Sequence, residues 1–129
     1  MLKLQGPTPD LQAAFKTIVD TKAEALLVLE VPVTLNHRKQ IAEMATAQKL
    51  PSMCPAAYAD GLISFGTSVL DTWPGVPVYV DKILRGAKPG DLPVQVITRR
   101  YLTVNARTAH ELGLSVPAEL LKRADKVID

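Results

Sequence analysis

Four polar side chains follow, or lie in, the apolar segments that the sequence predicts as strands. In an open α/β sheet the carboxyl ends of parallel strands meet at one edge, and ligands bind beyond that edge. A carboxylate there suits a cationic group of a ligand, and hydroxyl groups together with backbone N–H groups suit an anionic one. The predicted ligand contacts are Glu30, Thr34, Tyr58 and Ser64.

Each of these residues also has a purely structural interpretation. Glu30 could be a solvated residue at a strand end, and Thr34 could cap a helix. Tyr58 could pack half-buried with its hydroxyl group in water, and Ser64 could bond to neighbouring backbone. The sequence leaves both interpretations open for all four residues.

Catalysis and metal binding have weaker support than ligand binding. Cys54 is the single cysteine, and a nucleophilic role would require a neighbouring base and an oxyanion site. His37 and His110 are the two histidines; they belong to no catalytic motif, and no close-spaced pair of metal ligands occurs. A buried, inert thiol is therefore the favoured interpretation of Cys54, and no cofactor or metal is predicted.

Length and composition indicate one soluble globular domain. The chain has 129 residues, of which 47% are hydrophobic and 22% charged, with a formal net charge of +2. The densest basic clusters, residues 37–39 and 99–100, are short and lack interleaved aromatic residues, so no nucleic-acid partner is predicted. A single cysteine excludes an internal disulfide.

No targeting or membrane segment is visible in the sequence. The first residues contain no apolar stretch of the length that a signal peptide needs. The longest apolar run, residues 25–29, is far shorter than the ~20 residues of a membrane span. As written, the chain is expected to be cytoplasmic.

The first half alternates predicted helices and strands, which favours α/β layering. Apolar residues at helical spacing predict a first helix that Thr8 caps, with Asp10 in its first turn. A second helix is expected over residues 35–49, capped by Thr34 or Asn36. The predicted strands are residues 25–29, 51–54 and 62–66.

The second half begins with a predicted interruption. Two prolines and a glycine between Trp73 and Pro77 cannot lie inside a regular helix, so a new helix should begin there and end at Gly86. Its inner face is predicted to carry Val76, Tyr79, Val80, Ile83 and Leu84. Further elements follow: strands at residues 94–97 and 101–104, a helix from Asn105 to a left-handed Gly113, and a last helix over residues 115–128.

Two stretches carry a resemblance to a known family. VYVDKILRGAKPGDLPV followed by YLTVNARTAHELGLSVPAELLKRADKVI, and the earlier ALLVLEVPVTLNHRKQIAEMATAQKLPSM, are similar to substrate-binding proteins of ABC transporters. The family includes aromatic amino-acid binders, and its members are two-lobed and more than twice as long. Phe65 stands where family members often have tyrosine.

The resemblance implies a fold and a division of the chain. It implies an α/β, Rossmann-like three-layer sandwich, in the form of a lobe like those of periplasmic binding proteins of type I, with C-terminal elements from the second lobe. Within one α/β domain over residues 1–129, about 5–75 would form the lobe-like half. About 76–129 would return to the missing lobe.

The resemblance also implies a function without catalysis. It implies a solute-binding component of an ABC-type uptake transporter, or a truncated relative, that binds a small organic solute such as an amino acid. A membrane permease and an ATPase would be its partners, and the periplasm its location. The loops that carry the four predicted contacts would face the cleft, where the amino and carboxylate groups of the solute are held.

Other functions remain open at this point. One alternative is a stand-alone cytoplasmic ligand-sensing or interaction domain, and the weakest is a small enzyme that uses Cys54. Orphaned parts of a two-lobed fold expose apolar faces, so a homodimer is expected, with exchanged C-terminal elements as one form of it.

Overall fold

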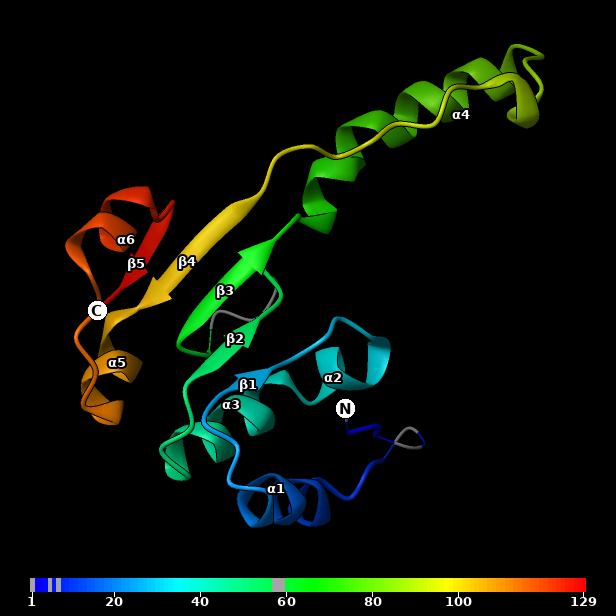
Figure 1. The fold of residues 1–129 in the computed structure, drawn as a ribbon. Helices are drawn as coiled ribbons and strands as arrows, with labels where there is room; N and C mark the ends of the chain where they lie inside the picture. The colour runs from blue at the N-terminus through cyan, green and yellow to red at the C-terminus, as the bar shows by residue number, and fades with distance from the viewer. Residues whose placement is uncertain (1, 5, 7, 57–59) are drawn as a thin grey trace.

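A five-stranded mixed sheet organises the chain, in the order β1-β2-β3-β4-β5 (Figure 1). The computed structural model describes residues 2–4, 6, 8–56 and 60–129. Strands β1, β2 and β3 are parallel, β4 is antiparallel to β3, and β5 is parallel to β4. The expected α/β class is therefore confirmed.

The first half supplies three helices and the three parallel strands. Their bounds are α1 Leu11–Asp20, β1 Leu26–Leu27, α2 Pro32–Asn36, α3 Arg38–Ala47, β2 Ser52–Cys54 and β3 Ile63–Gly66. Asp10, rather than the predicted Thr8, caps α1, because its carboxylate accepts a hydrogen bond from the Ala13 N–H at 2.9 Å. The predicted helix over residues 35–49 is two helices that meet at His37, and the first of them begins at Pro32.

The main core lies between α1, α3 and one face of β1 and β2. It contains six buried side chains: Leu11, Phe15, Val28, Ile41, Ala45 and Cys54. Helix α5 joins α3 on this side, and the Lys49 ammonium group donates a hydrogen bond to the Glu111 carbonyl at the end of α5. The apolar residues of α1 recur at helical spacing and the buried residues of β2 alternate along the strand, so each element buries one face in this core.

The opposite face of the parallel strands remains exposed. Leu27 pairs with Met53, and Met53 pairs with Ile63, so these side chains project from one face together with Phe65. Leu27 is 65% exposed, Met53 41% and Phe65 43%. The main core lies on the other face, which carries Cys54.

Residues 67–100 leave the sheet after β3 and return to it at β4. The outgoing part contains a 3-10 helix, η1 Val69–Gly75, and helix α4 Val76–Leu84; the return passes a short 3-10 turn, η2 Pro89–Asp91, and runs back extended. Together they form an arm that projects from the body (Figure 1). The predicted interruption at residues 73–77 is confirmed, because α4 begins at Val76. Residues 94–97, a predicted strand, are extended but belong to no sheet.

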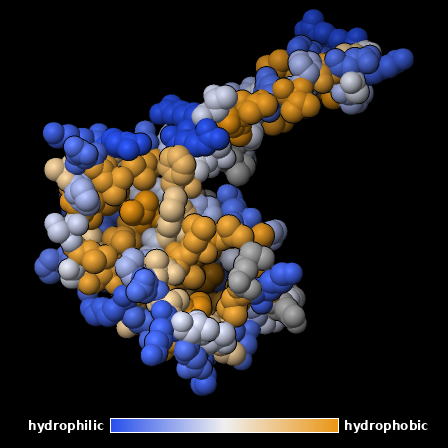
Figure 2. Space-filling model, viewed as in Figure 1, coloured by the Kyte–Doolittle hydropathy of each residue, from blue (hydrophilic) through white to orange (hydrophobic). Residues whose placement is uncertain are grey.

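Helix α4 buries none of its side chains. Its predicted inner face is therefore wrong for the described residues: Val76 is 54% exposed, Val80 49% and Leu84 82%. The chain exposes 9241 Å² in total, whereas a compact monomer of 14.0 kDa exposes roughly 6,700 Å². The arm accounts for the open shape (Figure 2).

The last elements are β4 Tyr101–Asn105, α5 Ala106–Leu112, α6 Ala118–Arg123 and β5 Lys126–Ile128. Asn105 caps α5 and Gly113 adopts a left-handed conformation with φ 72, as predicted. The predicted helix over residues 115–128 is wrong in its second half. Asp125 exchanges hydrogen bonds with the Leu102 backbone in both directions, which aligns β5 beside β4.

Strands β4 and β5 extend the sheet of the first half. Residues 101–128 therefore lie with β1–β3, whereas the sequence analysis placed everything after about residue 76 with a second lobe. Only the arm departs from the body (Figure 1). A return to a second lobe stays a prediction for the arm.

A close contact at Gly61 yields a test of this packing. A methyl group at Gly61 would lie 2.8 Å from the Cys54 Sγ and 3.1 Å from the Ser52 Oγ. Gly61→Ala should lower the free energy of unfolding by about 1–3 kcal/mol, measured by urea denaturation. Gly90→Ala, with open space around it, is the matched control and should change it by less than about 1 kcal/mol. Equal stability of the two variants would contradict the packing around Cys54.

Candidate ligand-binding edge

The carboxyl ends of the parallel strands β1, β2 and β3 lie at one edge of the sheet. Because β4 runs antiparallel to β3, its amino end joins the same edge, where Tyr101 pairs with Gly66. The arm leaves and re-enters the body at this point. We call this region the carboxyl edge; it contains the end of β1–β3, the start of β4 and the root of the arm.

Two of the predicted contacts follow β1 at the carboxyl edge. Glu30 is exposed, so its carboxylate is available to a ligand or to water. Thr34 is buried, and its hydroxyl group donates to the Leu29 carbonyl at 2.7 Å or the Val31 carbonyl at 2.9 Å and accepts from the Val31 N–H at 3.1 Å. Thr34 thus shapes the loop that presents Glu30. It lies inside α2, whose N-cap is Val31, so the prediction that Thr34 or Asn36 caps a helix beginning at residue 35 is wrong.

The other two predicted contacts differ in what the structure describes. Ser64 is 2% exposed, and its hydroxyl group has no hydrogen-bond partner among the described residues. It lies opposite Cys54 on the helix-covered face of the sheet. Tyr58 lies outside the described residues. The structure therefore brings Glu30 and Thr34 together and places Ser64 beneath the edge.

The sequence analysis missed a polar cluster at the root of the arm. The Tyr101 hydroxyl group donates a hydrogen bond to the Asp71 Oδ1 at 3.0 Å, and the Arg99 guanidinium group lies 4.7 Å from the centre of the Tyr101 ring. The Asp71 Oδ2 is buried and has no hydrogen-bond partner in the described part of the chain. The cluster joins η1 to the start of β4.

Desolvation raises the pKa of the Tyr101 phenol, and the hydrogen bond to Asp71 raises it further, against an opposing effect of Arg99. The phenol group is thereby kept protonated as the donor to Asp71. The one signal in the sequence was the basic pair at residues 99–100 next to an aromatic residue. Nothing local linked that pair to a carboxylate 30 positions earlier.

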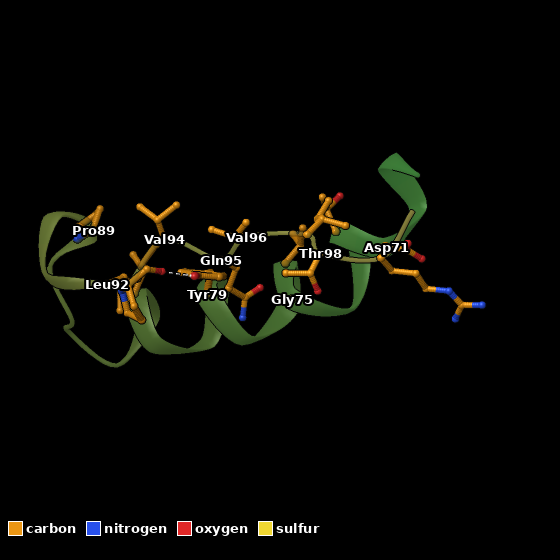
Figure 3. A pocket seen from close by; sticks show the side chains of 15 residues that line it. Asp71, Gly75, Tyr79, Pro89, Leu92, Val94, Gln95, Val96 and Thr98 are labelled. Carbon is orange, nitrogen blue, oxygen red and sulfur yellow. Dashed lines mark hydrogen bonds between the residues drawn. The ribbon is translucent and has the colours of Figure 1, made fainter. Parts of the chain in front are cut away.

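A groove of about 950 Å³ runs along the arm from this cluster. Its walls are α4 and the extended return of residues 92–99, as Figure 3 shows. The Tyr79 hydroxyl group bridges the walls by donating to the Pro93 carbonyl, while Val94 and Val96 point away from α4 (Figure 3). The groove is open and largely apolar, and Asp71 and Arg99 are among its lining residues.

Cys54 does not have the surroundings of a nucleophile. It is 4% exposed, and burial raises the pKa of its thiol, an effect that a hydrogen bond with Ser52 partly opposes. A raised pKa lowers the thiolate fraction, and the thiolate is the reactive form. Among the described residues no group of three or more His, Cys, Asp or Glu side chains could hold a metal ion. No helix in that part of the chain is long and apolar enough to cross a membrane.

Comparison with known proteins identifies the family. Residues 6–128 match the family described as ABC transporter substrate binding protein. The chain belongs to this family. The resemblance that the sequence showed is thus confirmed over nearly its whole length. No protein of curated function matches the chain.

Three solved structures share the fold. A conserved domain protein from Vibrio cholerae has a TM-score of 0.82 at 26% identity, over 92% of this chain and 40% of its own. An ABC domain in complex with L-Trp from Streptococcus pneumoniae has a TM-score of 0.77 at 27% identity, over 90% and 40%. A substrate-binding protein from Clostridium difficile with adhesive properties, at 19% identity and a TM-score of 0.61 over 92% and 40%, shares the fold alone.

The chain spans about two-fifths of the length of these structures. The periplasmic-binding-protein-like fold is therefore confirmed for one part of such a protein. The arm is one open feature of this part, since α4 buries none of its side chains among the described residues.

The cluster at the root of the arm predicts a titration. The folded-state pKa of Tyr101 lies above the unfolded value of about 10, so the stability it contributes is present below that pH and is lost as the pH rises through the folded-state pKa. Asp71→Asn should lower the Tyr101 pKa, because a tyrosinate no longer faces a carboxylate. Tyrosinate absorbance as a function of pH measures this, and Tyr101→Phe identifies the transition. An unchanged titration in Asp71→Asn would contradict the hydrogen bond.

The buried thiol makes a second prediction. Cys54 should react with a thiol-specific chromogenic disulfide much more slowly in the folded chain than in denaturant, because modification requires local opening. Fast modification without unfolding would show that the thiol is accessible and would reopen the nucleophile interpretation.

Proposed function

We propose that the chain forms part of the solute-binding component of an ABC-type uptake transporter and binds a small organic solute, such as an amino acid, at the carboxyl edge. Membership of the substrate-binding family over residues 6–128 carries this proposal. The structural relative in complex with L-Trp supports an amino acid as the solute class. The proposed role is binding without a covalent step.

The groups at the carboxyl edge suit a zwitterion. Glu30 is an exposed carboxylate after β1 and suits an ammonium group. Arg99, beside Tyr101, supplies a guanidinium group for a carboxylate. Thr34 contributes by holding the loop that presents Glu30. Tyr58 and Ser64 remain proposed contacts. Ser64 is buried in β3, beneath the carboxyl edge.

The affinity expected of this part alone is low. Binding proteins of two lobes hold a solute between them and close around it, so each lobe supplies one wall. The described residues form an open edge rather than an enclosed cavity. We therefore expect millimolar rather than micromolar affinity for free amino acids, about 4 kcal/mol of binding free energy.

The same proposal includes the other components of the transporter. A permease and an ATPase would take up the solute that the binding component delivers. Family membership supports a location of that component in the periplasm or outside the cell. The exposed apolar arm favours a second candidate function, a stand-alone ligand-sensing or interaction domain that works as a dimer.

Glu30 allows a matched test of the binding edge. Amide chemical shifts of the 129-residue chain should change progressively as L-Trp is added to millimolar concentration, first at residues 30, 66, 67 and 101. Glu30→Gln should weaken the binding by up to about fivefold, because a solvated ion pair contributes up to about 1 kcal/mol. Glu24→Gln is the control, since Glu24 is also exposed but precedes β1 at the opposite edge.

Two results would contradict the proposed function. If none of the common amino acids changes the amide chemical shifts at the carboxyl edge, this edge is not a binding site. Equal weakening by Glu24→Gln and Glu30→Gln would assign the effect to net charge rather than to the edge.

A further inference from the structure

The arm carries an unpartnered apolar stripe. Val76, Val80 and Leu84 recur at intervals of four residues along α4, and Trp73 precedes them by about one turn. Their exposed fractions lie between 49% and 82%. Figure 2 shows apolar side chains along most of the arm and hydrophilic ones gathered at its tip. We call the four residues the arm stripe.

The body carries a second uncovered apolar surface on the sheet. Leu27, Leu29, Met53 and Phe65 project from the face opposite the main core, and their exposed fractions lie between 41% and 65%. We call these four residues the bare face. In α/β domains such a face is covered by helices, because each apolar sheet face must be buried against another layer.

The two surfaces match in kind and size. Helix α4, with nine residues, is about 14 Å long. The bare face spans three strands, or about 10 Å across the sheet. An apolar helix stripe and an apolar sheet face are the two halves of one α/β layer contact.

The arm stripe lies away from the bare face of its own chain. The arm leaves the sheet at Gly66 and points away from the body (Figure 1). Among the described residues, helix α4 contacts η1 and, through the Tyr79 hydroxyl group, the extended return at Pro93, and both belong to the same arm. A second copy, however, brings both surfaces, and a two-fold axis lets each arm lie on the sheet of the other.

The exposed area is large enough for such an exchange. The chain exposes 9241 Å², roughly 2,500 Å² more than a compact monomer of its mass. A stable interface of standard size buries about 800 Å² per partner. A dimer that covers both surfaces of each copy therefore removes only part of the excess.

We propose that the chain forms a two-fold homodimer in which the arm stripe of each copy covers the bare face of the other. The contact is reciprocal and closed, so it yields a dimer rather than a filament. It does not depend on which solute the carboxyl edge binds, and it can fail while the proposed function holds.

The molar mass of the chain in solution is the first test. Light scattering after size-exclusion chromatography should give twice 14.0 kDa at micromolar concentration. Val80→Asp places a charge in the arm stripe and should shift the chain to a monomer, with a dissociation constant raised at least about 100-fold. A monomeric unmutated chain overturns the proposal.

Val78→Asp is the matched control for Val80→Asp. Both are valines of α4, with exposed fractions of 50% and 49%, but they lie about 200° apart around the helix. Val78→Asp should remain dimeric, and circular dichroism should show equal helix content in the two variants. Loss of the dimer in both variants, or in neither, overturns the assignment to the arm stripe.

Mixing two variants separates arm-on-sheet from arm-on-arm contact. Met53→Asp disrupts the bare face but leaves the arm stripe intact, so it should also be monomeric on its own. A mixture of Val80→Asp with Met53→Asp should form a heterodimer, because one intact stripe meets one intact face. A dimeric Met53→Asp chain, or a mixture that stays monomeric, overturns the proposal, since arm-on-arm contact predicts no such recovery.

Discussion

The antiparallel pairing of β3 with β4 is the constraint on which the rest of the structure depends. It fixes Gly66 beside Tyr101, so the chain must leave the sheet and return to it at the same point. Residues 67–100 can then only form an excursion with its two ends side by side. The hydrogen bond from Tyr101 to Asp71 ties the outgoing 3-10 helix to the returning strand at the root of that excursion.

The pairing of β3 with β4 also adds polar side chains to the carboxyl edge. Parallel strands alone would place only the residues after β1, β2 and β3 there. Because β4 starts where β3 ends, Tyr101 and the neighbouring Arg99 join Glu30 at one edge of the sheet. Carboxylate, guanidinium and phenol groups from separate segments thus lie along one edge of the sheet, with Glu30 after β1 and Tyr101 three strands away in β4.

An apolar sheet face or helix stripe is normally buried against a second layer, and two such surfaces of this chain have no such layer among the described residues. Helices α1 and α3 bury one face of β1 and β2, and the other face of β1–β3 keeps apolar side chains in contact with water. The arm, too, has a helix without a partner layer. The solved structures that share this fold are more than twice as long, and this chain spans about two-fifths of their length. In the proposed dimer a second copy would bury both surfaces.

Features governed by local interactions could be predicted from the sequence. The stripe of α1, the helix break at residues 73–77, the Asn105 cap and the left-handed Gly113 all depend on neighbours within a turn or two. The family resemblance was equally a property of the sequence. It implied the fold class and the solute-binding role.

Features governed by distant partners were decided only by the tertiary structure. Residues 126–128 fit the apolar spacing of a helix, yet pairing with β4 makes them a strand. Asp71 reaches Tyr101 only because the sheet brings their segments together, and Thr34 is held by carbonyl groups of a loop that the sequence left undefined. Sequence spacing specifies which side chains share a face, but strand pairing across long separations decides which faces meet.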